Sequence, residues 1–168
     1  MKRLAVVVVL MAALVGTATA APARNINLLR AFAVQLPKVK KSTTVPVLLP
    51  ALLPTGGTYK VYGTGYATKS TWNLELDGAP NCGGANACFI AGFEGKRGGK
   101  LPGKANARLA AGDPAFFLPF SCGGSCSPDS FYFTHRGVLY SWQGKDLPKN
   151  PKALLVRLAN EAIAAGPR

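Results

Sequence analysis

Acidic side chains and histidine are scarce in this chain, and their scarcity limits the chemistry that it can carry. The 168 residues include 7 Asp and Glu and 1 His against 20 Lys and Arg, which gives a formal net charge of +13. Histidines and carboxylates are the usual ligands of catalytic metals, so a metal site is not expected. No cofactor is expected either, because no glycine-rich segment has the strand-loop-helix context of a phosphate-binding motif.

The residues that general acid-base catalysis would need are present but do not form a known motif. His135 would have to serve any Ser-His-Asp triad, with Asp113 or Asp129 as its acid. It lies at or beside an expected hairpin tip, so we predict that it is mostly exposed and dispensable. Glu75 and Asp77 alternate on the polar side of an expected strand, which favours a solvated face over a glycosidase pair. We predict no catalytic residues, with a secreted hydrolase as the alternative.

One long apolar run occurs, and it lies at the N-terminus. Lys2 and Arg3 precede it, the run extends over residues 4–15, and residues 18–20 (Ala-Thr-Ala) supply the small-x-small pattern of a cleavage site. Twelve helical residues span about 18 Å, too short for a bilayer core of roughly 30 Å. We therefore predict that residues 1–20 are a signal peptide. The mature protein is expected to be secreted or extracytoplasmic, monomeric and without a transmembrane segment.

Cysteine is limited to four residues in two local pairs, spaced C-x5-C and C-x3-C. In an oxidising compartment four cysteines indicate two disulfides, for which three connectivities are open. We favour the two local bonds because each pair brackets a Gly-Gly turn. A four-cysteine zinc site fits the first spacing poorly, and exported proteins seldom keep reduced thiolates. The predicted disulfides are Cys82–Cys88 and Cys122–Cys126.

The pattern along the rest of the chain predicts one α+β domain. Residues 21–44 are expected to form a basic lead-in and linker with one short helix, Asn25 to Gln35, ended by Pro37. Residues 45–168 are expected to form a single disulfide-bonded domain with a twisted antiparallel sheet of about six strands. A C-terminal helix after Asn150, joined by the N-terminal helix, is expected to pack on one face. The segments with strand-like patterns are residues 58–62, 71–77, 88–94, 105–110, 115–120, 130–136 and 138–143.

The last hairpin leaves two registers open. A two-residue loop pairs Phe133 with Tyr140, whereas a three-residue loop that includes His135 pairs Tyr132 with Tyr140. The two-residue loop requires a positive φ at Arg136, which arginine disfavours. We therefore predict the three-residue loop.

Several motifs in residues 45–166 occur together. They are the Pro-x-Leu-Leu-Pro entry at residues 46–50, the Cys-Ser-Pro step at 126–128, the Phe133-x3-Gly-x2-Tyr140 hairpin and the helix that starts near Lys152. This combination resembles small exported bacterial proteins of unassigned function, mostly actinobacterial. Those relatives would place Trp where this chain has Phe133. The resemblance implies export and the fold, and it implies no catalytic residue, cofactor or substrate.

Positive charge is the remaining functional signal. Loss of the signal peptide removes two cations and leaves a net charge of +11. Free cations on a mobile, glycine-rich loop would attract anionic lipid headgroups or wall polymers, and export argues against nucleic acid. We predict a non-catalytic, envelope-associated binding or sensor-type module of unknown ligand, with a secreted hydrolase or an inhibitor presenting the loop as alternatives. The candidate binding residues are Lys96, Arg97, Lys100, Lys104 and Arg108.

Overall fold

The computed structural model describes residues 24–58, 60–82 and 87–168. The predicted signal peptide, residues 1–20, and the first predicted Gly-Gly turn, residues 83–84, lie outside the described residues. No helix within the described ranges is both long enough and apolar enough to cross a membrane.

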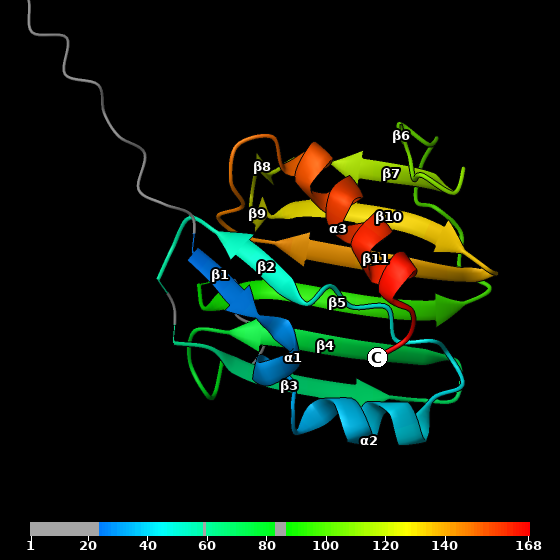
Figure 1. The fold of residues 1–168 in the computed structure, drawn as a ribbon. Coiled ribbons are helices and arrows are strands. Elements are labelled where there is room, and N and C mark those ends of the chain that lie inside the picture. Colours follow the sequence, from blue (N-terminus) through cyan, green and yellow to red (C-terminus); the bar gives the residue numbers. More distant parts are fainter. Residues whose placement is uncertain (1–23, 59, 83–86) are drawn as a thin grey trace, which may run out of the picture.

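Seven strands form one antiparallel sheet in the order β3-β4-β5-β11-β10-β7-β6 (Figure 1). The predicted fold class, α+β with a C-terminal helix on one face of the sheet, is confirmed. The strands are β3 (Tyr62–Ala67), β4 (Thr71–Asp77), β5 (Phe89–Arg97), β6 (Ala107–Arg108), β7 (Pro114–Leu118), β10 (Asp129–His135) and β11 (Val138–Gly144).

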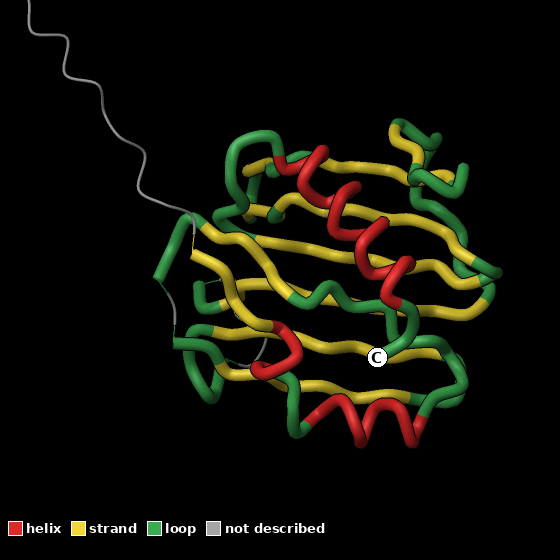
Figure 2. The backbone as a smooth tube through the Cα atoms, in the orientation of Figure 1, coloured by secondary structure: helices red, strands yellow, loops and turns green. Residues whose placement is uncertain are grey.

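The helices lie on one face of this sheet, and the core lies beneath them (Figures 1 and 2). Burial alternates along β4: Trp72, Leu74 and Leu76 are buried, and the residues between them are half-buried. The face with the buried residues is the one that packs against the helices. The C-terminal helix α3 (Pro151–Ala165) begins as its sequence predicts, with the Asn150 side chain accepting a hydrogen bond from the Ala153 amide.

Residues 24–44 form more structure than the sequence pattern predicts. The single helix expected from Asn25 to Gln35 is wrong. Strand β1 (Arg24–Asn27) pairs with β2 (Leu52–Thr55), and two helices follow it, α1 (Leu28–Ala31) and α2 (Gln35–Ser42). Pro37 does not end a helix; it lies in the first turn of α2, where a missing amide hydrogen costs little.

The same segment contributes side chains to the core of the sheet. Leu28 and Phe32 are fully buried and Val39 is 3% exposed. The described part of residues 21–44 is therefore packed into the domain and is not a linker.

The predicted three-residue loop of the last hairpin is also wrong. Phe133 pairs with Tyr140, and the two-residue turn places Arg136 at φ 49° and Gly137 at φ 74°. The rings of Phe133 and Tyr140 stack with their centroids 5.0 Å apart, and both side chains are buried. Burying each aromatic side chain gains about 1.5–3 kcal/mol, which exceeds the roughly 1–2 kcal/mol that a left-handed arginine costs.

The proline-rich segment after α2 crosses the sheet on the helix side (Figure 2). The Pro46 carbonyl accepts hydrogen bonds from Trp72 Nε1 and from the Tyr140 hydroxyl, both at 3.1 Å. At the C-terminus, the Arg168 amide donates to the Val47 carbonyl at 3.0 Å. These bonds hold the segment between the core aromatic residues and the end of α3.

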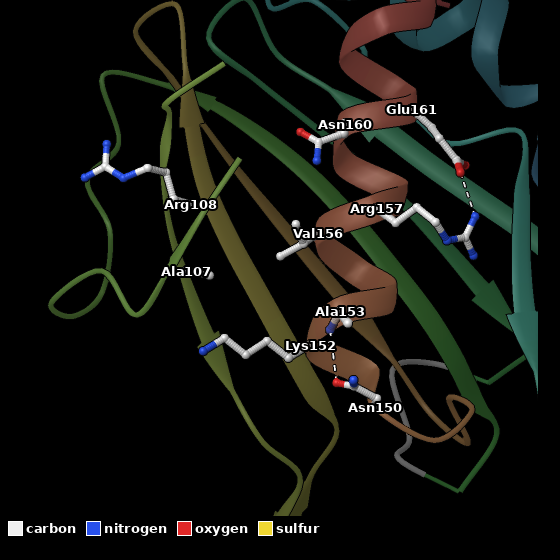
Figure 3. A pocket seen from close by; sticks show the side chains of 9 residues that line it. All are labelled: Ala107, Arg108, Asn150, Lys152, Ala153, Val156, Arg157, Asn160 and Glu161. Atoms are coloured by element: carbon white, nitrogen blue, oxygen red, sulfur yellow. Dashed lines mark hydrogen bonds and ion pairs between the residues drawn. The ribbon is translucent and has the colours of Figure 1, made fainter. Parts of the chain in front are cut away.

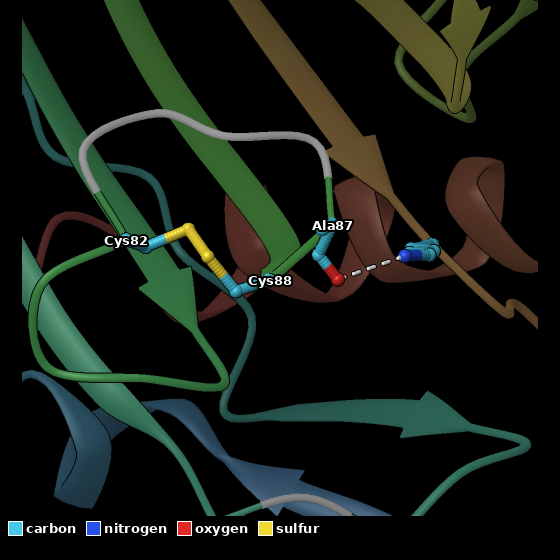
Figure 4. Close-up of a disulfide and its surroundings, with 4 residues drawn as sticks. Cys82, Ala87 and Cys88 are labelled. Atoms are coloured by element: carbon cyan, nitrogen blue, oxygen red, sulfur yellow. Dashed lines mark hydrogen bonds between the residues drawn. A yellow bond between two sulfur atoms is a disulfide. The ribbon is translucent and has the colours of Figure 1, made fainter.

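Both predicted disulfides are confirmed. Cys82 is bonded to Cys88 close to the start of β5 (Figure 4), and Cys122 is bonded to Cys126 across two short paired strands, β8 (Ser121–Cys122) and β9 (Cys126–Ser127). Disulfides persist in oxidising compartments, so the two bonds indicate an extracytoplasmic environment.

Candidate functional site

The five predicted binding residues are all exposed, but they do not form one patch. Lys96 and Arg97 end β5, whereas Arg108 lies in β6. Strands β11, β10 and β7 separate β5 from β6 in the sheet. With a strand spacing of about 4.8 Å, this order places Arg108 roughly 19 Å from β5. The cluster seen in the sequence is therefore divided in space.

The glycine-rich connection between β5 and β6 packs on the sheet and does not extend freely from it. A Cβ atom on Gly99 would lie 2.7 Å from Leu139 Cβ, and one on Gly103 would lie 3.0 Å from the ring of Phe116. Glycine at these two positions therefore permits a close approach between the backbone and the sheet. The loop therefore packs along the sheet at these glycines, while Lys100 and Lys104 are exposed.

Four segments that are distant in the sequence meet at one end of the sheet, on the right of Figure 1. Backbone hydrogen bonds join the Arg97 amide to the Ser70 carbonyl at 2.9 Å and the Thr44 amide to the Lys69 carbonyl at 3.1 Å. The Gly98 amide donates to the Gly137 carbonyl at 2.9 Å. The end of α2, the β3–β4 turn, the end of β5 and the β10–β11 turn are thus neighbours.

Each of these four segments brings exposed cations, and none of them contains an acidic residue. The Arg97 guanidinium donates to the Thr44 carbonyl at 2.8 Å, which fixes one charge between two of the segments. Among the described residues, no carboxylate forms an ion pair with these cations. We call this surface the basic end; its cations are Lys40, Lys41, Lys69, Lys96, Arg97, Lys100 and Arg136.

Two hollows lie side by side at the basic end. The outer hollow, of about 290 Å³, includes Lys40, Thr43 and Thr44 in its lining. The inner pocket, of about 110 Å³, is lined by Pro46, Leu48, His135, Arg136, Tyr140, Ile163, Gly166 and Pro167. Both linings include Pro46 and Pro167, so the two hollows adjoin each other.

His135 lies in the wall of the inner pocket and is not an exposed tip residue. Its Nδ1 donates to Asp113 Oδ2 at 2.6 Å, and the two side chains are 17% and 25% exposed. The prediction that His135 is mostly exposed is therefore wrong. Of the two acids that the sequence offers as partners, the structure selects Asp113, while Asp129 accepts a hydrogen bond from the Phe120 amide at 2.9 Å.

Tyr140 forms another part of the pocket wall. Burial raises the pKa of its phenol to about 12, so the hydroxyl stays neutral and donates to the Pro46 carbonyl. The lining of this pocket contains neither serine nor cysteine. It therefore offers a histidine held by a carboxylate, with no side-chain nucleophile beside it.

A third hollow, a groove of about 560 Å³, lies between α3 and β6 and holds Arg108 (Figure 3). The guanidinium of Arg108 extends away from the helix and donates to the Gly112 carbonyl at 2.8 Å. Arg157 pairs with Glu161 at 2.6 Å, and Lys152 Nζ donates to the Asn106 carbonyl at 2.6 Å. The lining of this groove therefore includes an acidic side chain, Glu161, which pairs with one of its cations.

The acid pair Glu75 and Asp77 does not lie on a fully solvated face. Asp77 is 5% exposed, and burial is the main cause that raises its pKa. The pKa of Glu75 is also raised, first by burial and then by the neighbouring charge of Asp77. Both carboxyls are therefore more easily protonated in the folded chain than in the unfolded chain.

We expect this pair to make stability depend on pH. A raised pKa in the folded state means that stability falls as the pH rises above the ordinary values of 3.8 and 4.5. Glu75→Gln should therefore raise the free energy of unfolding at pH 7 and flatten its decline between pH 4 and pH 7. Urea denaturation at both pH values measures this. Glu161→Gln, which removes an exposed carboxylate together with its ion pair to Arg157, controls for the change in net charge. An unchanged decline in Glu75→Gln would contradict the prediction.

No family model matches the chain, and the comparisons with curated proteins and with solved structures found no match either. The fold and the site define an α+β protein with two disulfides and a basic end.

Proposed function

We propose that the protein is an exported, non-catalytic binding module of the cell envelope that holds anionic wall polymers at its basic end. The observation that carries the proposal is the meeting of seven exposed cations at one end of the sheet, where Lys40 lines the outer hollow and Arg136 lines the inner pocket. Like charges gathered at one end repel each other, so an anionic partner that neutralises them is favoured. The two disulfides agree with an oxidising compartment.

The shape of the basic end supports a polymer over a flat lipid surface. Anionic groups that project from a flexible chain can enter hollows of about 290 and 110 Å³, whereas headgroups in a bilayer plane contact mainly the protruding cations. A polymer that carries repeated anionic groups could therefore contact both hollows at once.

The test is neutralisation of four lysines of the basic end, Lys40 in α2, Lys69 in the β3–β4 turn, Lys96 at the end of β5 and Lys100 just after it, all to Gln. Near an anionic surface each cation contributes about 1 kcal/mol, so affinity for a purified anionic wall polymer should fall about 100-fold or more. Wild-type affinity should also fall steeply between low and moderate salt. Sedimentation with the polymer measures both effects.

A control variant removes the same charge elsewhere, at Arg24, Arg30, Lys60 and Lys149, all to Gln. This control should keep most of the affinity, because Arg24 and Arg30 lie in β1 and α1, and Lys60 and Lys149 precede β3 and α3, whereas the basic end includes the turn that follows β3. An equal loss in both variants would show a net-charge effect and contradict the proposed site. Binding to anionic vesicles without binding to the polymer would replace the polymer with a lipid surface.

A further inference from the structure

Arg136 occupies a backbone conformation that its side chain does not favour. It stands at the first position of a two-residue turn with φ 49°, where glycine, asparagine and aspartate are the usual residues. Arg136 lines the inner pocket, and its guanidinium forms no ion pair with another described residue. Backbone strain of this kind often occurs at binding sites. The presence of arginine at position 136 therefore suggests that its charge serves the pocket.

His135 places a second polar group in the same pocket. Because Nδ1 donates to Asp113, the ring orientation is fixed and Nε2 is the nitrogen left for an occupant. Asp113 does not itself line the pocket, so its negative charge lies behind the ring. Nε2 can donate to an anionic oxygen when the ring is protonated, or accept from an acidic hydroxyl when the ring is neutral.

The size of the pocket limits what can enter. At about 110 Å³ it is smaller than the cavity of about 150 Å³ that accommodates benzene, so a group of about five heavy atoms fits and a sugar ring does not. Leu48 and Ile163 supply apolar walls, which strengthen a charge-assisted hydrogen bond by excluding water.

Phosphate suits these groups better than carboxylate does. A carboxylate held by a bidentate contact with the Arg136 guanidinium offers His135 only its remaining lone pairs, which lie in the same plane as that contact. A phosphate group presents further oxygens, so Arg136 and His135 can bind it together.

We infer that the inner pocket binds one phosphate group, held by Arg136 and His135. This inference rests on the proposed function, because it names the anionic group that the basic end would recognise. The remainder of a phosphate-bearing polymer would pass over Pro46 and Pro167, which are shared by both linings, towards Lys40 and Thr43 in the outer hollow.

The experiment is a calorimetric titration of the mature protein with glycerol 3-phosphate, with inorganic phosphate, acetate and glycerol as parallel arms. We expect one site per chain for glycerol 3-phosphate and at least tenfold weaker binding of acetate. Arg136→Gly should lower the affinity for glycerol 3-phosphate at least tenfold. Because glycine adopts φ 49° without strain, the same variant should melt at a higher temperature than the wild type, which separates loss of binding from loss of folding.

Two further variants sharpen the test. His135→Asn should also lower the affinity for glycerol 3-phosphate, whereas Lys149→Gln, which removes one distant cation, should leave that affinity unchanged. Unchanged affinity in Arg136→Gly, equal binding of acetate, or no binding of glycerol 3-phosphate would overturn the inference. Equal affinity for inorganic phosphate and glycerol 3-phosphate would identify free phosphate as a sufficient ligand. Higher affinity for glycerol 3-phosphate would indicate that the natural ligand is a phosphate group attached to a larger molecule.

The two proposals can fail separately. The variant with Lys40, Lys69, Lys96 and Lys100 changed to Gln keeps the inner pocket intact, so it should still bind glycerol 3-phosphate while losing the polymer. If the wild type binds glycerol 3-phosphate at one site but does not bind the polymer, the polymer proposal fails and the phosphate pocket stands.

Discussion

Replacing Phe32 with Ala is expected to lower the free energy of unfolding by about 3–5 kcal/mol, the usual cost of truncating a buried aromatic residue. Phe32 is fully buried in the segment between α1 and α2, and its ring meets the edge of Phe93 with centroids 6.3 Å apart. A Cβ atom added to Gly63 would lie 2.9 Å from Phe32 Cδ1, so β3 packs directly on the ring. The substitution would leave a cavity between the N-terminal segment and the sheet. Equilibrium urea denaturation measures the loss.

Val34 provides the matched control for this substitution. It lies two residues further along the same segment and is 64% exposed, so Val34→Ala should change the free energy of unfolding by about 0.5 kcal/mol or less. A loss below about 1 kcal/mol in Phe32→Ala would show that residues 24–44 are not part of the cooperative core.

The Phe32 prediction depends on a packing that the sequence pattern did not reveal. The pairing of β1 with β2 joins Arg24 to Thr55, across the whole of α1 and α2. Neither four-residue strand shows a clear alternation of polar and apolar residues, and Pro54 in β2 has no amide hydrogen to donate to a partner strand. Long-range pairing of short edge strands depends on tertiary contacts, and local patterning carries no information about them.

Features with strong local signals were predicted well. The alternation in β4, the Asn150 cap with Pro151 at the start of α3, and the two disulfides within short loops all correspond to the structure. Each of these depends on residues within a few positions of one another. The predicted length of the hairpin turn was wrong because that turn depends on a tertiary contact. Burial of Phe133 and Tyr140 outweighs the preference of Arg136 for a negative φ.

The basic end overlaps the predicted binding residues only in part. The sequence pointed to the run from Lys96 to Arg108 because its charges are contiguous in the chain. The basic end keeps Lys96, Arg97 and Lys100 from that run but adds Lys69 and Arg136, which only the sheet topology brings close. Sequence spacing cannot show that the β3–β4 turn and the β10–β11 turn lie at the same end of the sheet.

Gly95→Ala is the second substitution with a large expected effect, a loss of about 3 kcal/mol in the free energy of unfolding. Gly95 lies in β5 opposite Trp72, and an added Cβ would overlap the indole, with Trp72 Cε2 only 2.6 Å away. The indole cannot move aside easily, because it is fully buried and its Nε1 donates to the Pro46 carbonyl. Thermal and urea denaturation measure the loss.

The same substitution should also weaken ligand binding, because Pro46 lines both hollows of the basic end. Displacing Trp72 would release one of the two hydrogen bonds that hold the Pro46 carbonyl, so polymer and glycerol 3-phosphate affinity should fall in the fraction that stays folded. Gly92→Ala is the matched control in the same strand. A Cβ there meets only the ring of Phe89, at an ordinary 3.4 Å, so stability should be unchanged or slightly higher. Equal stability of the two variants would show that the indole of Trp72 does not fix the position of Pro46.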